Sequence, residues 1–116
     1  MKRFLCGLAA LCLFLGMAGQ GKGQPTYGFA TLNVPGSSVP YTYAFGIDAS
    51  GQIVGSYSDA AGNRQGFLLD HGNYTTLDVP GSLFTTAYGI NASGQIVGYY
   101  TDAAAGAHGF LGIPVP

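Results

Sequence analysis

The decapeptide Gly46-Ile-Asp-Ala-Ser-Gly-Gln-Ile-Val-Gly55 returns as Gly89-Ile-Asn-Ala-Ser-Gly-Gln-Ile-Val-Gly98, 43 residues further along the chain. The two copies agree at 16 of the 23 positions that begin at Gly46 and Gly89. A shorter block, Leu32-Asn-Val-Pro-Gly-Ser37, also returns, as Leu77-Asp-Val-Pro-Gly-Ser82. Repeats of about 40 to 45 residues are typical of stacked or radial architectures, because one unit alone cannot bury its apolar face. The repeat therefore predicts the fold, but it specifies no reaction or ligand.

Each unit alternates apolar and polar residues in short runs separated by Gly, Asn, Asp and Pro, which indicates antiparallel strands joined by turns. Asp48-Ala-Ser-Gly51 and Asn91-Ala-Ser-Gly94 are expected to be Asx turns, in which the glycine takes a positive φ. The alternation from residue 41 to residue 47 places four large apolar side chains on one face, which we expect to be the core face: Tyr41, Tyr43, Phe45 and Ile47. The eight strands that this pattern predicts are 27–34, 41–47, 52–57, 66–69, 74–79, 84–90, 95–100 and 109–111.

The predicted fold is all-β, with two four-stranded antiparallel repeats that resemble the blades of a β-propeller, after an N-terminal signal helix. Residues 25–116 are expected to form a single β-repeat domain, in which repeat 1 covers about 27–70 and repeat 2 about 72–113. Two blades cannot close a propeller, which typically has about 4 to 8. The strand at 27–34 and the strand at 109–111 are complementary halves of one hairpin, so we expect them to pair within one chain or between chains. Pairing between chains would make a homo-oligomer.

The first 24 residues have the composition of a secretory signal. Lys2 and Arg3 are followed by an uncharged stretch at 4–18 and then by small residues, with cleavage expected between 18 and 24. The alternative is an uncleaved anchor, although the apolar stretch is shorter than the roughly 20 residues that span a bilayer. The prediction is a secreted protein, extracellular or periplasmic, with no stable membrane insertion after cleavage. Both cysteines, Cys6 and Cys12, lie in this segment.

The charges that remain in residues 25–116 exclude one class of partner. Arg64 is the only Lys or Arg there, against five aspartates, which gives a net charge of about −4 (one minus five). Nucleic-acid binding requires several basic groups to displace counterions from phosphates, so we expect no nucleic-acid partner. The same count argues against attraction to anionic lipid.

The motif Gly-Ile-Asn-x-x-Gly-Gln-Ile-Val-Gly-x-Tyr from Gly89 to Tyr100, followed by His108-Gly-Phe-Leu111, resembles the bacterial extracellular repeats called HAF. The resemblance covers nearly all of residues 25–116 and implies a secreted, propeller-like β-repeat protein. The family has no established activity, so it implies no catalytic residues here. Two departures concern the His-Ala-Phe triplet: glycine replaces its alanine in both copies, and Gln65 replaces its histidine in the first.

The sequence contains no recognisable catalytic or metal-binding pattern, and we predict a protein that is not an enzyme and has no metal or cofactor. Metal sites need clustered His, Cys or carboxylate ligands, whereas His71 and His108 lie in different contexts. There is no Gly-x-Ser-x-Gly motif and no spacing that pairs two aspartates for glycoside hydrolysis. Lysine and cysteine nucleophiles are absent from 25–116.

The candidate binding residues are Tyr99, Tyr100, His108 and Arg64, all proposed to be exposed. Adjacent Tyr99 and Tyr100 must point to opposite faces of a strand, so one of them should be exposed and able to stack on a sugar or a peptide. The competing explanation is cross-strand packing. The predicted function is a binding or structural module at the cell exterior, whose partner is an extracellular glycan, a protein or a second copy. The alternatives are a truncated remnant of a longer propeller without independent function, and a hydrolase acting on polysaccharide or protein.

Overall fold

The structure is a computed structural model that describes residues 24–37 and 41–116. Apart from Gln24, the expected signal segment at 1–24 lies outside the described residues, together with the signal helix, both cysteines and nearly all of the cleavage interval. The chain divides into two compact units, Met1–Leu32 and Asn33–Pro116. In the first unit, residues 24–32 form neither helix nor strand. All described strands belong to the second unit.

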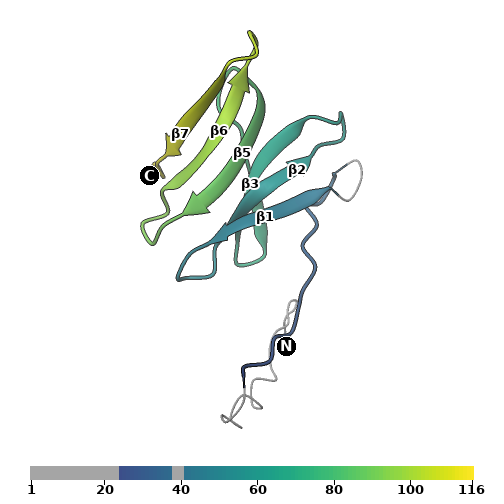
Figure 1. Ribbon diagram of the computed structural model, residues 1–116, viewed down its shortest axis with the longest axis vertical. Helices are drawn as coiled ribbons and strands as arrows, with labels where there is room; N and C mark the ends of the chain where they lie inside the picture. Colours follow the sequence, from purple (N-terminus) through teal and green to yellow (C-terminus); the bar gives the residue numbers. More distant parts are fainter. Residues whose placement is uncertain (1–23, 38–40) are drawn as a thin grey trace. The chain divides into compact units, whose positions relative to one another are not determined.

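The second unit contains two antiparallel sheets, and the described residues form no helix, which confirms the all-β prediction (Figure 1). Each sheet is a meander in which strands adjacent in sequence are also adjacent in space. The first sheet has four strands: β1 (Thr42–Ile47), β2 (Ile53–Ser58), β3 (Arg64–Asp70) and β4 (Asn73–Leu77). The second has three: β5 (Ser82–Ile90), β6 (Ile96–Asp102) and β7 (Ala107–Gly112).

The prediction of eight strands in two four-stranded repeats was wrong by one strand. Residues 27–34 form no strand, and the second sheet ends at β7. A segment becomes a strand only when its N–H and C=O groups pair with a neighbour. The repeat equivalent of 29–34 is 74–79, which overlaps β4 and pairs with β3 from Gly66↔Leu77 to Asp70↔Asn73. Residues 27–34 have no such ladder within the described chain.

The two Asx turns form as predicted and fix where the strands of each hairpin begin and end. The Asp48 Oδ1 atom accepts hydrogen bonds from the backbone N–H groups of Ser50 at 3.0 Å and Gln52 at 2.8 Å. Asn91 Oδ1 accepts the two equivalent bonds, both at 3.0 Å. The glycines that end these turns, Gly51 and Gly94, have φ values of 89° and 79°, a conformation that favours glycine.

The apolar core lies on both faces of the first sheet. On one face, Tyr57 and Phe67 are buried together with Val34, which precedes β1. On the other face, Val54 is buried against residues of the second sheet, Ala87 and Ile96. The first sheet is therefore the centre of the fold.

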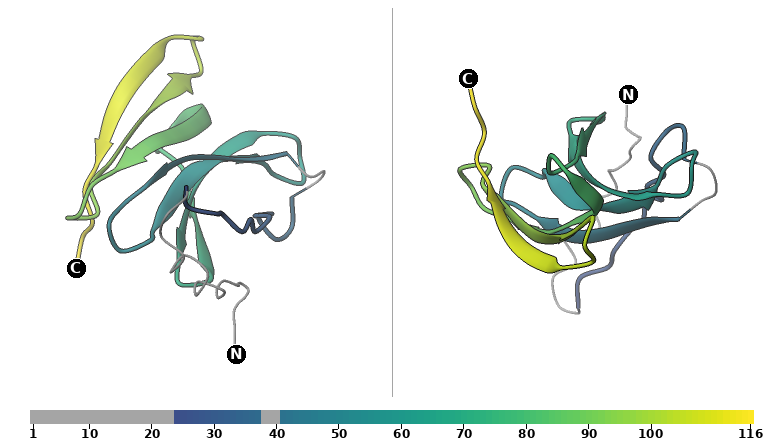
Figure 2. Two further views of the ribbon diagram at one scale, coloured as in Figure 1. Left: turned by 60° about the horizontal axis from the view of Figure 1, so that its bottom comes forward. Right: turned by 90° about the horizontal axis from the view of Figure 1, so that it is seen from above.

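Strand β5 lies across the first sheet, against β1, β2 and β3, and the two sheets stand at an angle to each other (Figure 2). Glycine permits this close approach. A Cβ atom on Gly46 would lie 2.7 Å from the Tyr88 carbonyl oxygen and 3.1 Å from the Gly89 Cα atom. Thr85 and Thr86 are both buried, because β5 is covered on both sides where it crosses.

The core face predicted for residues 41–47 was wrong. Tyr41, Tyr43, Phe45 and Ile47 are all exposed large apolar residues. Two features explain the difference. Strand β1 is the edge of its sheet, and a shift of register between Ala44 and Gly46 interrupts the alternation of side chains.

Candidate functional site

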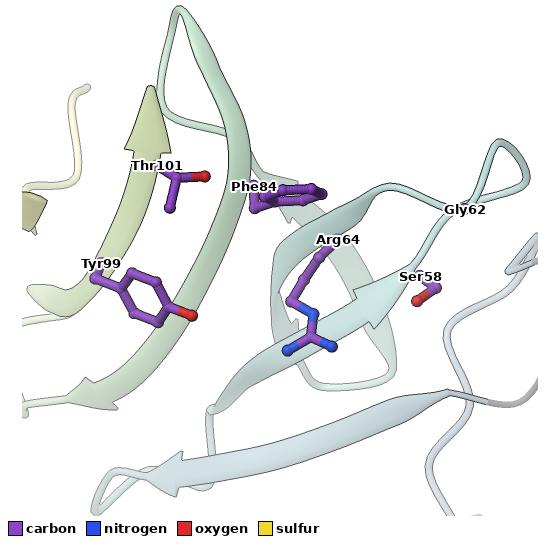
Figure 3. Close-up of a pocket in the computed structure, with 6 residues that line it drawn as sticks. All are labelled: Ser58, Gly62, Arg64, Phe84, Tyr99 and Thr101. Atoms are coloured by element: carbon purple, nitrogen blue, oxygen red, sulfur yellow. The ribbon is translucent and has the colours of Figure 1, made fainter. Parts of the chain in front are cut away.

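A groove of about 260 Å³ lies between the two sheets, on the face of the second sheet that carries Tyr99 of β6. Residues from both sheets line it (Figure 3). Ser58, Gly62 and Arg64 come from the hairpin that joins β2 to β3. The opposite wall is formed by Phe84 of β5 with Tyr99 and Thr101 of β6.

A row of aromatic rings runs beside this groove from β1 to β6. The rings of Tyr43 and Phe45 have centroids 6.3 Å apart, and Phe45 contacts Tyr88 of β5 at 4.7 Å. Tyr88 in turn stacks on Tyr99, with centroids 5.9 Å apart and planes inclined by 15°. The row joins the two sheets, and stacking on Tyr88 positions the Tyr99 ring in the groove.

The groove contains the only Lys or Arg side chain of residues 24–116. The Arg64 guanidinium carbon lies 6.0 Å from the centre of the Tyr43 ring, within the range of a cation–π contact. In the described part of the chain, the ion pairs are those of His71 with Asp70 and His108 with Asp102, so Arg64 makes none. Its charge is therefore available to a ligand.

The turn between β2 and β3 holds Arg64 at the mouth of the groove. Asp59 Oδ1 accepts hydrogen bonds from the backbone N–H groups of Ala61 at 3.0 Å and Asn63 at 2.9 Å. The Gln65 side-chain amide donates to Asp59 Oδ2 at 3.2 Å. The bond from the Asn63 backbone, followed by that from Gln65, lowers the pKa of Asp59 below its usual 3.8, so this turn is braced by an ionised carboxylate.

A second group, on the other face of β6, consists of Tyr100, His108 and Asp102. The rings of Tyr100 and His108 have centroids 5.1 Å apart, and His108 Nε2 lies 2.8 Å from Asp102 Oδ2. The hydrogen bond with His108, followed by the N–H of Gly106, lowers the pKa of Asp102. His108 stands 43 residues after Gln65, which makes the same contact with Asp59 in the first repeat. His108 therefore braces a turn, as Gln65 does.

The four residues proposed from the sequence fall into these two groups. Arg64 and Tyr99 line the groove, whereas Tyr100 and His108 lie together on the opposite face of β6. Arg64 and His108 are exposed as predicted, but Tyr99 and Tyr100 are both half-buried, because each ring packs on a neighbouring ring. Sequence reasoning missed the remaining residues of the groove, Ser58, Gly62, Phe84 and Thr101. Nothing in their local sequence separates them from their neighbours, since the groove exists only where the two sheets meet.

Within residues 24–37 and 41–116, no three His, Cys, Asp or Glu side chains are grouped so that they could hold a metal ion. Among the same residues, no helix is long and apolar enough to cross a membrane. Comparisons with protein-family models, with curated proteins and with solved structures find no match to this chain.

Proposed function

We infer that the chain is a binding module of the cell exterior, built from propeller-blade-like repeats, and that the groove between its sheets binds a glycan. The observation that carries this proposal is the meeting of Arg64 and Tyr99, from different repeats, in one open groove. An aromatic ring offers a flat apolar surface to a sugar ring, while a guanidinium donates paired hydrogen bonds to hydroxyl or carboxylate oxygens. The hydroxyl groups of Ser58 and Thr101 add two further hydrogen-bonding partners.

Size and charge narrow the class of glycan. A volume of about 260 Å³ is below the usual range of roughly 300–1,000 Å³ for drug-sized ligands, so the groove fits one sugar ring rather than several. One arginine can pair with one carboxylate, such as that of a uronic acid. Residues 25–116 otherwise carry five aspartates, so a densely sulfated or phosphorylated polymer is repelled. The proposed ligand is a sparsely charged glycan with a uronic acid at the Arg64 position.

Hydrolysis is not proposed, because none of the described residues that line the groove carries a carboxylate. Asp59 and Asp102, the aspartates nearest in sequence to the lining residues, accept hydrogen bonds from the backbone of their own turns. A remnant of a longer propeller is the second candidate, and the apolar side chains exposed on the second sheet, Val97 and Leu111, favour it. A remnant without independent function would bind no ligand and would aggregate through that face.

Isothermal titration of the chain with neutral, uronic-acid-containing and sulfated oligosaccharides tests this proposal. The expected result is saturable binding of the uronic-acid group, weakened at least tenfold by Tyr99→Ala and by Arg64→Gln. Tyr100→Ala is the matched control, since it removes the same side chain from the opposite face of the same strand and should leave binding unchanged. The proposal fails if no oligosaccharide binds, or if Tyr99→Ala and Tyr100→Ala weaken binding equally.

A further inference from the structure

The contact between the two sheets is built from residues whose repeat equivalents lie uncovered. Val54 of the first sheet is 0% exposed, packed with Ala87 and Ile96, and Leu68 borders the same cluster. A shift of 43 residues carries Val54 to Val97 and Leu68 to Leu111. These equivalents, on the face of the second sheet that also carries Tyr99, are 50% and 57% exposed.

The other half of the contact is duplicated as well, on the first sheet. Ala87 of β5 is fully buried, and Ile90 packs against the same cluster. Their equivalents 43 residues earlier are Ala44 and Ile47 of β1. Ala44 is exposed, and Ile47 is 65% exposed. The residues on both sides of the buried contact thus have exposed repeat equivalents. The equivalents of the first-sheet side lie on the second sheet, and those of the second-sheet side lie on the first.

The equivalent glycines of the two repeats differ in the same way. Gly46 is required within the chain, because a Cβ atom there would lie 2.7 Å from the Tyr88 carbonyl oxygen of the crossing strand β5. Its repeat equivalent, Gly89, takes part in the same crossing through its Cα atom, but no backbone of the described residues lies within 4 Å of the position of its own Cβ. A Cβ atom on Gly89 would meet only the Val97 side chain, at 3.4 Å, an ordinary contact distance. Among the described residues, no backbone fills the space beside Gly89.

We propose that a second copy of this chain docks head to tail on the second sheet. The β1 strand of the second copy crosses β5, β6 and β7 as β5 crosses β1, β2 and β3 within the chain. Ala44 and Ile47 of that copy then cover Val97 and Leu111, and the Gly89 position admits its backbone. The contact is heterologous, which means that two different surfaces meet. Every chain carries both surfaces, one on its first sheet and the other on its second sheet. The contact covers the face of the second sheet that also carries Tyr99, but it does not rest on the glycan proposal.

The edge of the second sheet fits the same arrangement. Strand β7 pairs with β6 on one side, while among the described strands nothing pairs with its other side. Its equivalent β3 pairs there with β4, which leads directly into β5. Residues 29–34 are the repeat equivalent of 74–79 and lead into β1 in the same way. The docked copy therefore brings its own 29–34 to the open edge of β7, where the segment can become the missing fourth strand.

The number of chains follows from the geometry of closed repeats. A heterologous contact makes a ring if its rotation closes. Propellers close with about 4 to 8 blades, so two blade-like sheets per chain predict rings of about two to four chains. Closure also removes the exposed sheet edge, which would otherwise pair with other chains and aggregate.

One position differs between the internal contact and the proposed one. Tyr99 stands where the first repeat has Ser56, which is fully buried under β5. The Tyr99 ring lies along Tyr88, stacked at 5.9 Å, and so leans toward β5. The variant Tyr99→Ser restores the first repeat's residue. It should keep or strengthen docking while it removes the aromatic wall of the groove.

Light scattering on a sizing column provides the first test. The chain is expressed from its complete sequence in an exporting host, and mass spectrometry records the N-terminus of the product. The expected mass is that of two to four chains. Gly89→Ala and Val97→Asp should both reduce it to one chain while the circular dichroism spectrum stays unchanged. Val115→Asp is the matched control, because Val115 is 84% exposed and lies outside the strands, and should not alter the mass.

Disulfide trapping provides the second test and distinguishes head-to-tail docking from other contacts. Chains carrying Ala44→Cys and chains carrying Val97→Cys are oxidised separately and as a mixture. The expected product is a covalent dimer in the mixture alone, because each variant offers only one half of the contact. The unsubstituted chain controls for Cys6 and Cys12.

Three results would overturn the proposal: a wild-type chain that stays monomeric at every concentration, a disulfide dimer from Val97→Cys alone, or equal loss of mass in Val97→Asp and Val115→Asp. The two proposals fail separately. Glycan binding that persists in monomeric Gly89→Ala would leave the groove proposal standing, and assembly that persists in Tyr99→Ser without glycan binding would leave the docking proposal standing.

Discussion

The two sheets share a repeated sequence, but their surroundings differ. The first sheet has buried residues on both faces, packed beside Val34 on one face and beside β5 on the other. The second sheet packs on the first through Ala87 and Ile96, while its opposite face exposes Val97 and Leu111. Equivalent residues of the two repeats therefore contribute differently to the free energy of unfolding. A repeat fixes the local structure of each unit, but the contribution of a side chain to stability depends on which neighbour covers it.

The paired aromatic residues of the two repeats show this difference. Phe67 and Phe110 occupy equivalent positions, yet Phe67 is fully buried and Phe110 is half-buried. Tyr57 is buried and its hydroxyl lies 2.8 Å from Thr76 Oγ1, across the sheet on β4. Among the described strands the second sheet has no equivalent of β4, and Tyr100, the equivalent of Tyr57, packs on His108 instead.

The largest expected effect is the difference in the free energy of unfolding between alanine variants of the two equivalent phenylalanines. Phe67→Ala should lower the free energy of unfolding by about 3–5 kcal/mol, since it empties a fully buried site. Phe110→Ala should cost roughly half as much, because the half-buried ring removes less apolar surface from water. Urea denaturation of both variants at one chain concentration measures the difference. Equal losses would mean that the two sheets are equally covered in solution.

The two equivalent glycines give an intermediate effect. Gly46→Ala should lower the free energy of unfolding by about 1–3 kcal/mol, because its Cβ would press on the Tyr88 carbonyl and push β5 away from β1. Gly89→Ala meets no backbone within the chain and should cost less than about 1 kcal/mol when measured on the monomer. The order of the two melting temperatures tests this comparison, and a reversed order would contradict it.

The smallest expected effect concerns the two Asx turns and their response to acid. Desolvation would raise the pKa of Asp48, but hydrogen bonds from the Gln52 backbone and from Ser50 outweigh it, so the pKa is lowered from its usual 3.8. The stability that this carboxylate contributes is therefore fully present above pH about 3.8 and is lost as pH falls through the lower, folded-state pKa. Asn91 makes the same backbone hydrogen bonds without titrating.

Exchanging the two turn residues measures this effect. Asp48→Asn should leave the melting temperature nearly unchanged at pH 7 and reduce its decline between about pH 5 and pH 2. Asn91→Asp should increase that decline. Thermal unfolding followed by circular dichroism across this range gives both values. A decline that is identical in all three chains would show that the Asp48 turn does not contribute to acid sensitivity.

The repeat by itself indicates the role of His108. The shift of 43 residues places His108 opposite Gln65, and both brace an aspartate-opened turn. A glutamine at the equivalent position was a signal that the histidine has a structural function. Arg64 and Tyr99 are different, since 35 residues separate them and only the approach of the two sheets brings them to one groove. No local pattern could have paired them.

By itself the sequence determined the strand type, the Asx turns and the two-fold repetition, because these depend on residues close together in the chain. Side-chain alternation sets a strand, and an Asp or Asn followed by Gly sets a turn. Only the tertiary structure decided which repeated residues are buried, why β1 exposes its large apolar residues, and where the groove lies. Burial depends on contacts between residues distant in sequence. Two copies of one sequence motif, placed at different positions in the fold, therefore have different neighbours and different energies.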